Sequence, residues 1–200
     1  MEVGLVLLAA GGSARLGEPK QTLRYHGKSL LQRAVQAALN SVCQPVVVVL
    51  GANIKTTLPE LGGISAVQVV ENPAWQDGMA SSIRYGLTTM LQVKPSVAGI
   101  ILMVCDQPFA DAALLDKLVH EKYKTGKGIA ASAYNGTLGT PVLFDKVYFP
   151  ELLSLKGQEG AKKLVFRYSE DAVSVPFPLG SIDVDTPADY AALSLLQTPD

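Results

Sequence analysis

The sequence predicts an α/β fold in which a mostly parallel, Rossmann-like sheet lies between two layers of helices. Three observations support this prediction. Apolar runs of strand length recur along the chain, as in parallel strands that are buried on both faces. Helical patterns separate these runs, which is the β-α-β alternation of a doubly wound sheet. Small, glycine-rich segments follow strands, at the edge where open α/β sheets bind ligands.

The elements expected before Gly126 alternate regularly. The apolar run Val3–Ala9 predicts the first strand, and Ser29 predicts the N-cap of a helix over Leu30–Leu39. The other elements expected in this part are strands at Pro45–Gly51, Ala66–Val70 and Ala98–Val104, with helices at Met79–Leu91 and from Asp111 or Ala112 to about Gly126.

The pattern changes after Gly126, where shorter elements follow one another. The dipeptide Asn135-Gly136 predicts a turn between two strands. The expected elements are strands at Gly128–Ala133, Thr140–Phe144, Ala172–Val175 and Ser181–Val184, with helices at Lys146–Leu153, Gly160–Tyr168 and Pro187–Leu196. No linker, internal repeat or low-complexity run interrupts the chain, so we expect residues 1–200 to form one domain.

The composition narrows the classes of function. Hydrophobic residues make up 48% of the 200 residues and charged residues 18%, which is typical of a compact globular domain. The net charge of −1 argues against a nucleic-acid-binding face. No window of about 20 apolar residues predicts a membrane span, so the cytoplasm is the expected location. Two cysteines are too few for a disulfide framework, and Cys105 is expected to be buried.

The loop after the first strand, L-A-A-G-G-S-A-R-L-G-E-P-K-Q, predicts a polyphosphate site. Gly11, Gly12 and Ser13 let the backbone approach a ligand closely and direct N–H groups toward oxygen. Arg15 offers a planar guanidinium to phosphate, and Lys20 a compact charge. The simplest ligand is a nucleoside triphosphate, and the alternative is a glycine-rich surface turn with unrelated cations.

Two familiar glycine loops do not fit this segment. A Walker A loop requires Gly-Lys-Ser/Thr where this chain has Gly17 followed by Glu18-Pro19. The dinucleotide fingerprint requires a glycine pattern that opens directly into a helix, which Pro19 prevents.

Two acidic segments predict a metal site. Asp106 ends an apolar strand of the same sheet, and its carboxylate can hold Mg²⁺ against phosphates. Asp183 and Asp185 alternate, so one of them could complete the site; a turn-capping role for Asp106 is the alternative. Asp189 is expected in the first turn of the final helix, where a carboxylate stabilises the helix dipole.

A second ligand segment joins a strand to the helix that begins near Met79. Gly78, Ser81 and Ser82 place amides and hydroxyls near a helix N-terminus. Trp75 either contacts a flat ring of the ligand or packs against the core. Further along, Lys162 either meets the phosphate of a second substrate or lies on a solvated helix face.

The chain resembles the MobA-like NTP-transferase family, and more narrowly its molybdenum-cofactor cytidylyltransferase branch, in motifs that occur in the same order: L-A-A-G-G-S-A-R-L-G-E-P-K-Q, V-x-x-N-P-x-W-x-x-G-M-x-x-S-I, D-Q-P, G-T-P-V-L-F, G-x-E-G-A-K-K-L and I-D-V-D-T-P-A-D-Y. The resemblance implies a nucleotide-diphospho-sugar-transferase-like fold. It also implies Mg²⁺-dependent transfer of a nucleotidyl group from an NTP to a phosphorylated acceptor such as molybdopterin, with release of pyrophosphate. A molybdoenzyme or a chaperone would be a transient protein partner.

The resemblance assigns roles to residues of this chain. Arg15 and Lys20 are the expected catalytic cations, Asp106 and Asp185 the metal ligands, with Asp183 the alternative to Asp185. The acceptor is expected at Gly139, Pro141 and Lys162. The full set of residues expected to bind the nucleotide is Leu8, Ala9, Ala10, Gly11, Gly12, Ser13, Arg15, Lys20, Gly78, Ser81 and Ser82.

The resemblance also implies which part of the domain binds each substrate and which substrates these are. Residues up to about 126 would bind the nucleotide, and residues from about 127 the acceptor. Relatives that use CTP tend to read L-A-A-G, as this chain does, whereas those that use GTP tend to read L-A-G-G. The chain departs from many relatives at Thr140, where they have His, and at Lys162, where they have Arg. Sugar-phosphate or polyol-phosphate acceptors therefore stay open, as does a non-catalytic nucleotide-binding module.

Overall fold

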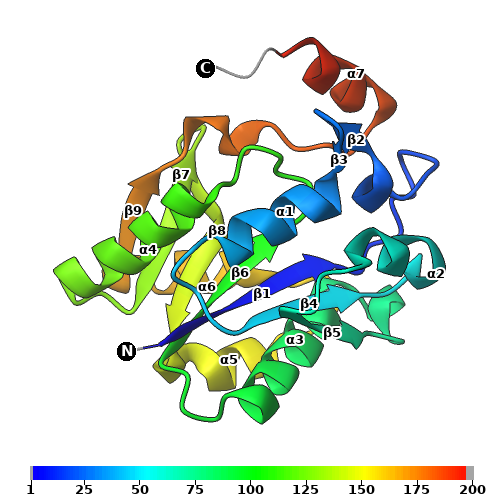
Figure 1. The fold of residues 1–200 in the computed structure, drawn as a ribbon. Helices are drawn as coiled ribbons and strands as arrows, with labels where there is room; N and C mark the ends of the chain where they lie inside the picture. Colours follow the sequence, from blue (N-terminus) through cyan, green and yellow to red (C-terminus); the bar gives the residue numbers. More distant parts are fainter. Residues whose placement is uncertain (1, 197–200) are drawn as a thin grey trace.

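The computed structural model describes residues 2–196 and contains a central seven-stranded sheet between two helical layers (Figure 1). The strand order is β5-β4-β1-β6-β8-β7-β9. β8 runs antiparallel to both of its neighbours, and the other pairs are parallel. The strands are β1 (Val3–Ala9), β4 (Val46–Leu50), β5 (Val67–Glu71), β6 (Gly99–Val104), β7 (Ile129–Tyr134), β8 (Thr137–Asp145) and β9 (Ala172–Pro176).

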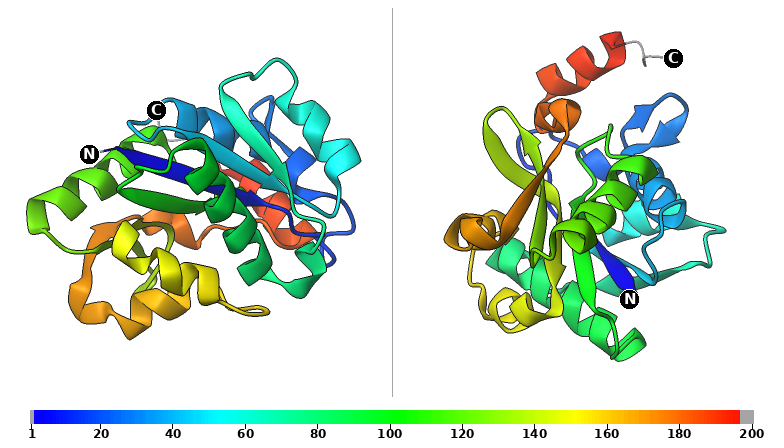
Figure 2. Two further views of the ribbon diagram at one scale, coloured as in Figure 1. Left: turned by 90° about the horizontal axis from the view of Figure 1, so that it is seen from below. Right: turned by 90° about the vertical axis from the view of Figure 1, so that its left-hand side faces the viewer.

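Helices cover both faces of the sheet, which confirms the three-layer prediction (Figure 2). One face packs against α1 (Leu30–Leu39) and α4 (Ala112–Thr125), and the other against α3 (Met79–Val93), α5 (Phe149–Ser154) and α6 (Ala161–Arg167). The short α2 (Ile54–Thr57) follows β4, and α7 (Pro187–Leu195) packs on a smaller apolar cluster beside α1. No helix among residues 2–196 combines the length and apolar character that crossing a bilayer requires.

The predicted caps account for the helix boundaries. Ser29 and Gln32 form a reciprocal capping box at the start of α1. Asp111 caps α4 by accepting a hydrogen bond from the Leu114 N–H, and Gly126 ends the same helix in the left-handed conformation. Asp189 lies in the first turn of α7, as predicted, and there it also completes a capping box with Thr186.

Three expectations after Gly126 need correction. The strand expected at Ser181–Val184 is wrong: Pro178–Ser181 forms a 3-10 helix, and the segment beyond it is irregular. Pro178 favours a helical turn here, and the Val184 N–H bonds to the Asp106 carbonyl rather than to a strand. The segment expected as one helix over Lys146–Leu153 begins as a 3-10 turn before α5, and the strand expected from Thr140 begins earlier, at Thr137.

The topology brings separate loops together. β1 lies between β4 and β6 and pairs with both in parallel, so the segments after the three strands emerge at one edge. This position is a topological switch point, because β4 lies on one side of β1 and β6 on the other. Open α/β sheets bind ligands at such a point. A small hairpin of β2 (Arg24–Tyr25) and β3 (Lys28–Ser29), which the sequence did not predict, connects this edge to α1.

Candidate functional site

A cluster of four charged side chains lies where the loops after β1 and β6 meet the segment before α7. Lys20 Nζ donates to Asp106 Oδ2 at 2.6 Å and to Asp185 Oδ1 at 2.7 Å. Arg15 Nη2 donates to the other Asp185 oxygen at 2.7 Å. The structure therefore brings together the two predicted catalytic cations and the two preferred metal ligands, although 170 residues separate Arg15 from Asp185.

The charges in this cluster stabilise one another. Burial alone would lower the pKa of Lys20, but the charge of Asp106 and hydrogen bonds to Asp106 and Asp185 outweigh it, so the pKa is raised. Burial would raise the pKa of Asp185, and its contacts with Lys20 and Arg15 lower it instead. Both partners therefore stay charged at neutral pH.

The two carboxylates suit a hard divalent cation. Asp106 and Asp185 each direct one oxygen to the same ammonium nitrogen, so they converge on a point that a cation can occupy. Mg²⁺ prefers oxygen ligands and binds through one or two carboxylates together with substrate oxygens. Residues 2–196 hold no group of three or more His, Cys, Asp or Glu arranged for a metal. A metal here would therefore take its remaining ligands from the substrate and water.

A cavity of about 460 Å³, the first cavity, opens beside this cluster. The end of β1 and the loop after it line this cavity, together with Trp75 and Met79 from the segment around the start of α3. An added Cβ at Gly12 would lie 3.1 Å from the Trp75 ring, so this glycine permits close contact between loop and indole. The predicted nucleotide-binding residues that line the cavity are Leu8, Ala9, Ala10, Gly11, Gly12, Lys20, Gly78 and Ser82.

The other three predicted nucleotide-binding residues do not line this cavity. Arg15 lies outside it, with 71% of its side chain exposed. Ser13 has a positive φ of 52° and accepts a hydrogen bond from the Lys20 N–H, so it shapes the loop. The buried Ser81 hydroxyl bonds to backbone carbonyls and accepts from Asn72, which holds the start of α3 in place.

Gln21 is a residue that the sequence analysis did not single out. Its side chain is buried and donates from Nε2 to the carbonyls of Ala9 and Gly11, at 2.8 and 3.0 Å. These bonds close the loop between β1 and the 3-10 helix that begins at Lys20. Sequence patterns do not reveal such a residue, because a glutamine beside a lysine is ordinarily a surface residue.

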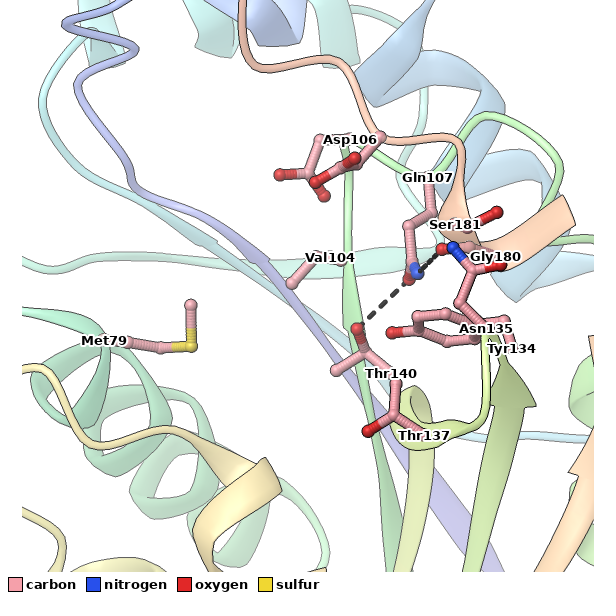
Figure 3. Close-up of a pocket in the computed structure, with 11 residues that line it drawn as sticks. Met79, Val104, Asp106, Gln107, Tyr134, Asn135, Thr137, Thr140, Gly180 and Ser181 are labelled. Atoms are coloured by element: carbon pink, nitrogen blue, oxygen red, sulfur yellow. Dashed lines mark hydrogen bonds between the residues drawn. The ribbon is translucent and has the colours of Figure 1, made fainter.

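A second cavity, of about 360 Å³, lies between the β7–β8 hairpin and the segment after β9 (Figure 3). Thr140 donates to Gln107 Oε1 at 3.1 Å, and Gln107 Nε2 donates to the Gly180 carbonyl at 2.8 Å. These bonds tie β8, the loop after β6 and the 3-10 turn over Pro178–Ser181 into one wall. The other polar groups of the lining come from Asp106, Tyr134, Asn135, Thr137, Ser181 and Asp183.

The three predicted acceptor residues lie beside the second cavity or away from it. Gly139 and Pro141 are buried in β8 and flank Thr140, whose side chain lines the cavity in their place. Tyr134 packs so closely on Gly139 that an added Cβ would lie 2.2 Å from the phenol oxygen. Lys162 is exposed on α6, over the ring of Phe166.

Asp183 differs from its neighbour Asp185. It lines the second cavity, whereas Asp185 pairs with Lys20 and Arg15. Partial burial and the nearby charge of Asp106 raise the pKa of Asp183. Cys105 is buried, as its position after a strand predicted, and lines the first cavity. Burial raises the pKa of its thiol to about 12.

The two cavities share three residues: Met79, Val104 and Asp106. In Figure 3 Asp106 lies at the top of the second cavity and Met79 at its left, across from Thr140 and Tyr134. Two ligands bound in the two cavities would meet at the carboxylate that also contacts Lys20.

Comparison with known proteins agrees with this geometry. Residues 5–172 match the model of the MobA-like NTP transferase domain. The chain belongs to the MobA-like NTP transferase family. The match confirms the resemblance seen in the motifs. Members of this family act on small-molecule nucleotide substrates and typically use divalent metal ions.

Curated proteins that are similar to this chain carry different names. The chain is 31% identical over 166 residues to nicotine blue oxidoreductase of Paenarthrobacter nicotinovorans, covering 78% of each chain. It is 20% identical over 190 residues to the molybdenum cofactor cytidylyltransferase of Escherichia coli, covering 94% of this chain and 93% of the other.

Among solved structures, Rv0371c of Mycobacterium tuberculosis superposes with a TM-score of 0.81 at 29% identity, covering 97% of this chain and 98% of that one. A manganese complex of Rv0371c scores 0.76 at 28% identity and covers 96% and 98% of the two chains.

Proposed function

We propose that this nucleotidyltransferase is a Mg²⁺-dependent cytidylyltransferase that transfers CMP from CTP to a phosphorylated acceptor, molybdopterin in the first instance, and releases pyrophosphate. The observation that carries the proposal is the meeting of two cavities at Asp106, beside Lys20. A donor in the first cavity and an acceptor in the second would bring their phosphates to this point.

In this proposal the first cavity takes the CTP. The loop from Leu8 to Gly12 lies along the base, and Gly78 and Ser82 at the start of α3 take part of the sugar or phosphates. The choice of CTP rests on the L-A-A-G sequence that ends β1. Ser13 and Ser81 support this site through the backbone contacts described above.

The reaction requires no covalent enzyme intermediate, because the acceptor phosphate is already a nucleophile at neutral pH. One of its oxygens attacks the α-phosphorus in line, a new P–O bond forms, and the bond to the β-phosphate breaks with its electron pair leaving on pyrophosphate. Lys20 and Arg15 stabilise the charge of the leaving group. Catalysis then consists of positioning and charge stabilisation.

Asp106 and Asp185 would hold Mg²⁺, which when bound supplies positive charge to the phosphate oxygens. Lys20 has to release at least one carboxylate for this, and the triphosphate offers it new anionic partners. The manganese complex of Rv0371c supports a divalent ion in a related protein.

A second acceptor class, sugar or polyol phosphates, is favoured by the chemistry of the second cavity. Six of its eleven lining residues carry a hydroxyl or an amide side chain, and among the described residues neither lysine nor arginine contributes to it. Such a wall suits a hydroxyl-rich acceptor that carries its charge on one phosphate near Asp106. Gly139 and Pro141 would then act by placing Thr140, and Lys162 would meet only the outer end of a long acceptor.

The proposed function also implies a location and partners in the cell. Both substrates would come from the cytoplasm, and the product of a molybdopterin reaction would pass to a molybdoenzyme or its chaperone in a transient contact. Neither a nucleic acid nor a membrane is needed as a partner.

The test measures binding and turnover separately. Thermal unfolding with CTP, GTP, ATP and UTP, each with Mg²⁺, is expected to give the largest rise in melting temperature with CTP. Pyrophosphate release is then measured with CTP and a panel of molybdopterin, sugar phosphates and polyol phosphates. Binding of CTP without pyrophosphate release from any acceptor would favour a non-catalytic nucleotide-binding module, and absence of stabilisation by any triphosphate would contradict the proposal.

A further inference from the structure

The two central charged residues of the site are each followed by a buried glutamine. Gln21 follows Lys20 and is 1% exposed, and Gln107 follows Asp106 and is 5% exposed. Each side-chain amide donates to backbone carbonyls of residues that line the adjacent cavity. Gln21 donates to Ala9 and Gly11 in the first cavity, and Gln107 to Gly180 in the second. Glutamine is rarely buried, so both side chains call for a reason beyond packing.

The orientation of the Gln21 amide is fixed by its partners. Only the NH₂ group can donate, and it meets two carbonyl oxygens, so a flipped amide would set oxygen against oxygen. The Oε1 atom on the other side is buried and lacks a hydrogen-bond partner among the described residues. An unsatisfied buried acceptor destabilises the fold, so Gln21 holds the loop at a cost in stability.

The bonds from Gln21 determine how the loop presents its backbone. Ala9 and Gly11 both line the first cavity, and together with Ala10 and Gly12 they form one wall of it, the base wall. The peptide that carries the Gly11 carbonyl is trans and planar, so fixing that oxygen on Gln21 directs the Gly12 N–H to the opposite side. Gln21 thereby sets which polar groups the base wall turns toward a ligand.

We propose that Gln21 is a positioning residue that determines base selectivity: it fixes the direction of the Gly12 N–H in the base wall, and this donor suits the unprotonated N3 of cytosine but opposes the N3–H of uracil. This inference rests on the proposed function, because it takes a nucleotide as the ligand of the first cavity. The side chains of Lys20 and Arg15, which would meet the triphosphate, bond to Asp106 and Asp185 and not to the Gln21 amide. Base recognition and phosphate binding are therefore separable by substitution.

The experiment compares Gln21→Met with Gln107→Met in the full chain. Methionine has a similar length and shape but makes no comparable hydrogen bonds, and Gln107 offers a matched buried glutamine in the second cavity. Trp75, the single tryptophan, lines the first cavity and serves as the fluorescence probe. Dissociation constants are measured with Mg²⁺ for CTP, UTP and inorganic tripolyphosphate, which lacks a base.

For Gln21→Met we expect CTP to bind about tenfold more weakly, the loss of roughly one hydrogen bond, and the CTP-to-UTP affinity ratio to fall toward one. The dissociation constant of tripolyphosphate should stay within about twofold of the wild-type value. Gln107→Met should keep the CTP-to-UTP ratio of the wild type. Gln21→Asn, which keeps the amide but shortens its reach, supplies the same comparison where Gln21→Met does not fold.

Two results would overturn the inference. One is an unchanged CTP-to-UTP ratio in both Gln21 variants. The other is an equal weakening of CTP and tripolyphosphate, which indicates a general structural role. Failure of the wild type to bind any triphosphate would instead count against the proposed function, so the two failures are distinguishable.

Discussion

The two cavities are built in different ways although they share Asp106. The first takes the largest share of its wall from one segment, the end of β1 and the loop after it, in which small residues predominate. The second takes its wall from side chains on the loop after β6, the β7–β8 hairpin and the segment before α7. A site made from contiguous backbone is visible as a sequence motif, whereas one made from scattered side chains becomes visible only after folding.

The largest effect should come from the cluster between the cavities. Lys20→Ala and Asp106→Ala are each expected to lower kcat by about two to three orders of magnitude, because a charge that stabilises the transition state is lost. The measurement is pyrophosphate release at saturating CTP and acceptor. Unfolding curves of the same variants provide the control for folding, and a folded Asp106→Ala enzyme with near-normal turnover would disprove the role assigned to Asp106.

A smaller effect should separate the second cavity from the first. Thr140→Val keeps the shape of the side chain and removes the hydrogen bond to Gln107. We expect the KM of the acceptor to rise about tenfold, while the dissociation constant of CTP changes less than about twofold. Steady-state kinetics with each substrate varied in turn decide the matter. A change confined to CTP would show that the two cavities are not divided as described.

The smallest effect concerns what holds the second half of the chain together. Asp171 accepts hydrogen bonds from the Tyr148 hydroxyl at 2.5 Å and from the Gly128 N–H at 3.0 Å. Burial would raise the pKa of Asp171, but these bonds and nearby lysines lower it. Its contribution to stability is therefore present above the unfolded pKa of about 3.9, and is lost as the pH falls through the lower folded value.

Asp171→Asn should accordingly lower the melting temperature by about 2–4 °C at pH 7, the shift expected for roughly 1 kcal/mol in a domain of this size. At pH values below the lowered folded pKa of Asp171 the wild type and the variant should converge, because the wild-type carboxyl is then protonated as well. Calorimetry across this range measures the difference. A gap that persists at low pH would mean that the charge of Asp171 is not what stabilises the fold.

Patterns in the sequence predicted the parallel half of the fold closely. Buried parallel strands such as β4 are continuous apolar runs, and caps such as Ser29 and Gly126 mark the ends of helices. The site residues that follow those strands, Lys20 and Asp106, were found for the same reason. Local signals sufficed because each element here carries its own boundary residues.

The features that the sequence did not predict depend on contacts between distant segments. The strand expected at Ser181–Val184 has an alternating pattern, but its Ile182 N–H bonds to the Leu179 carbonyl within the 3-10 turn and its Val184 N–H to the Asp106 carbonyl. Thr140 rather than its neighbours faces the second cavity because side chains alternate along β8, and the sequence does not state which face is which. Gln21 and Gln107 became recognisable only once their burial was known.

The wall of Met79, Val104 and Asp106 common to both cavities has a consequence for inhibitor chemistry. A single compound that tethers a cytidine to a phosphorylated polyol would fill both spaces at once and lose translational freedom only once. Its affinity should exceed that of either fragment by a factor that depends on the length of the bridge. The bridge length that gives the highest affinity would thus measure the separation of the two bound substrates.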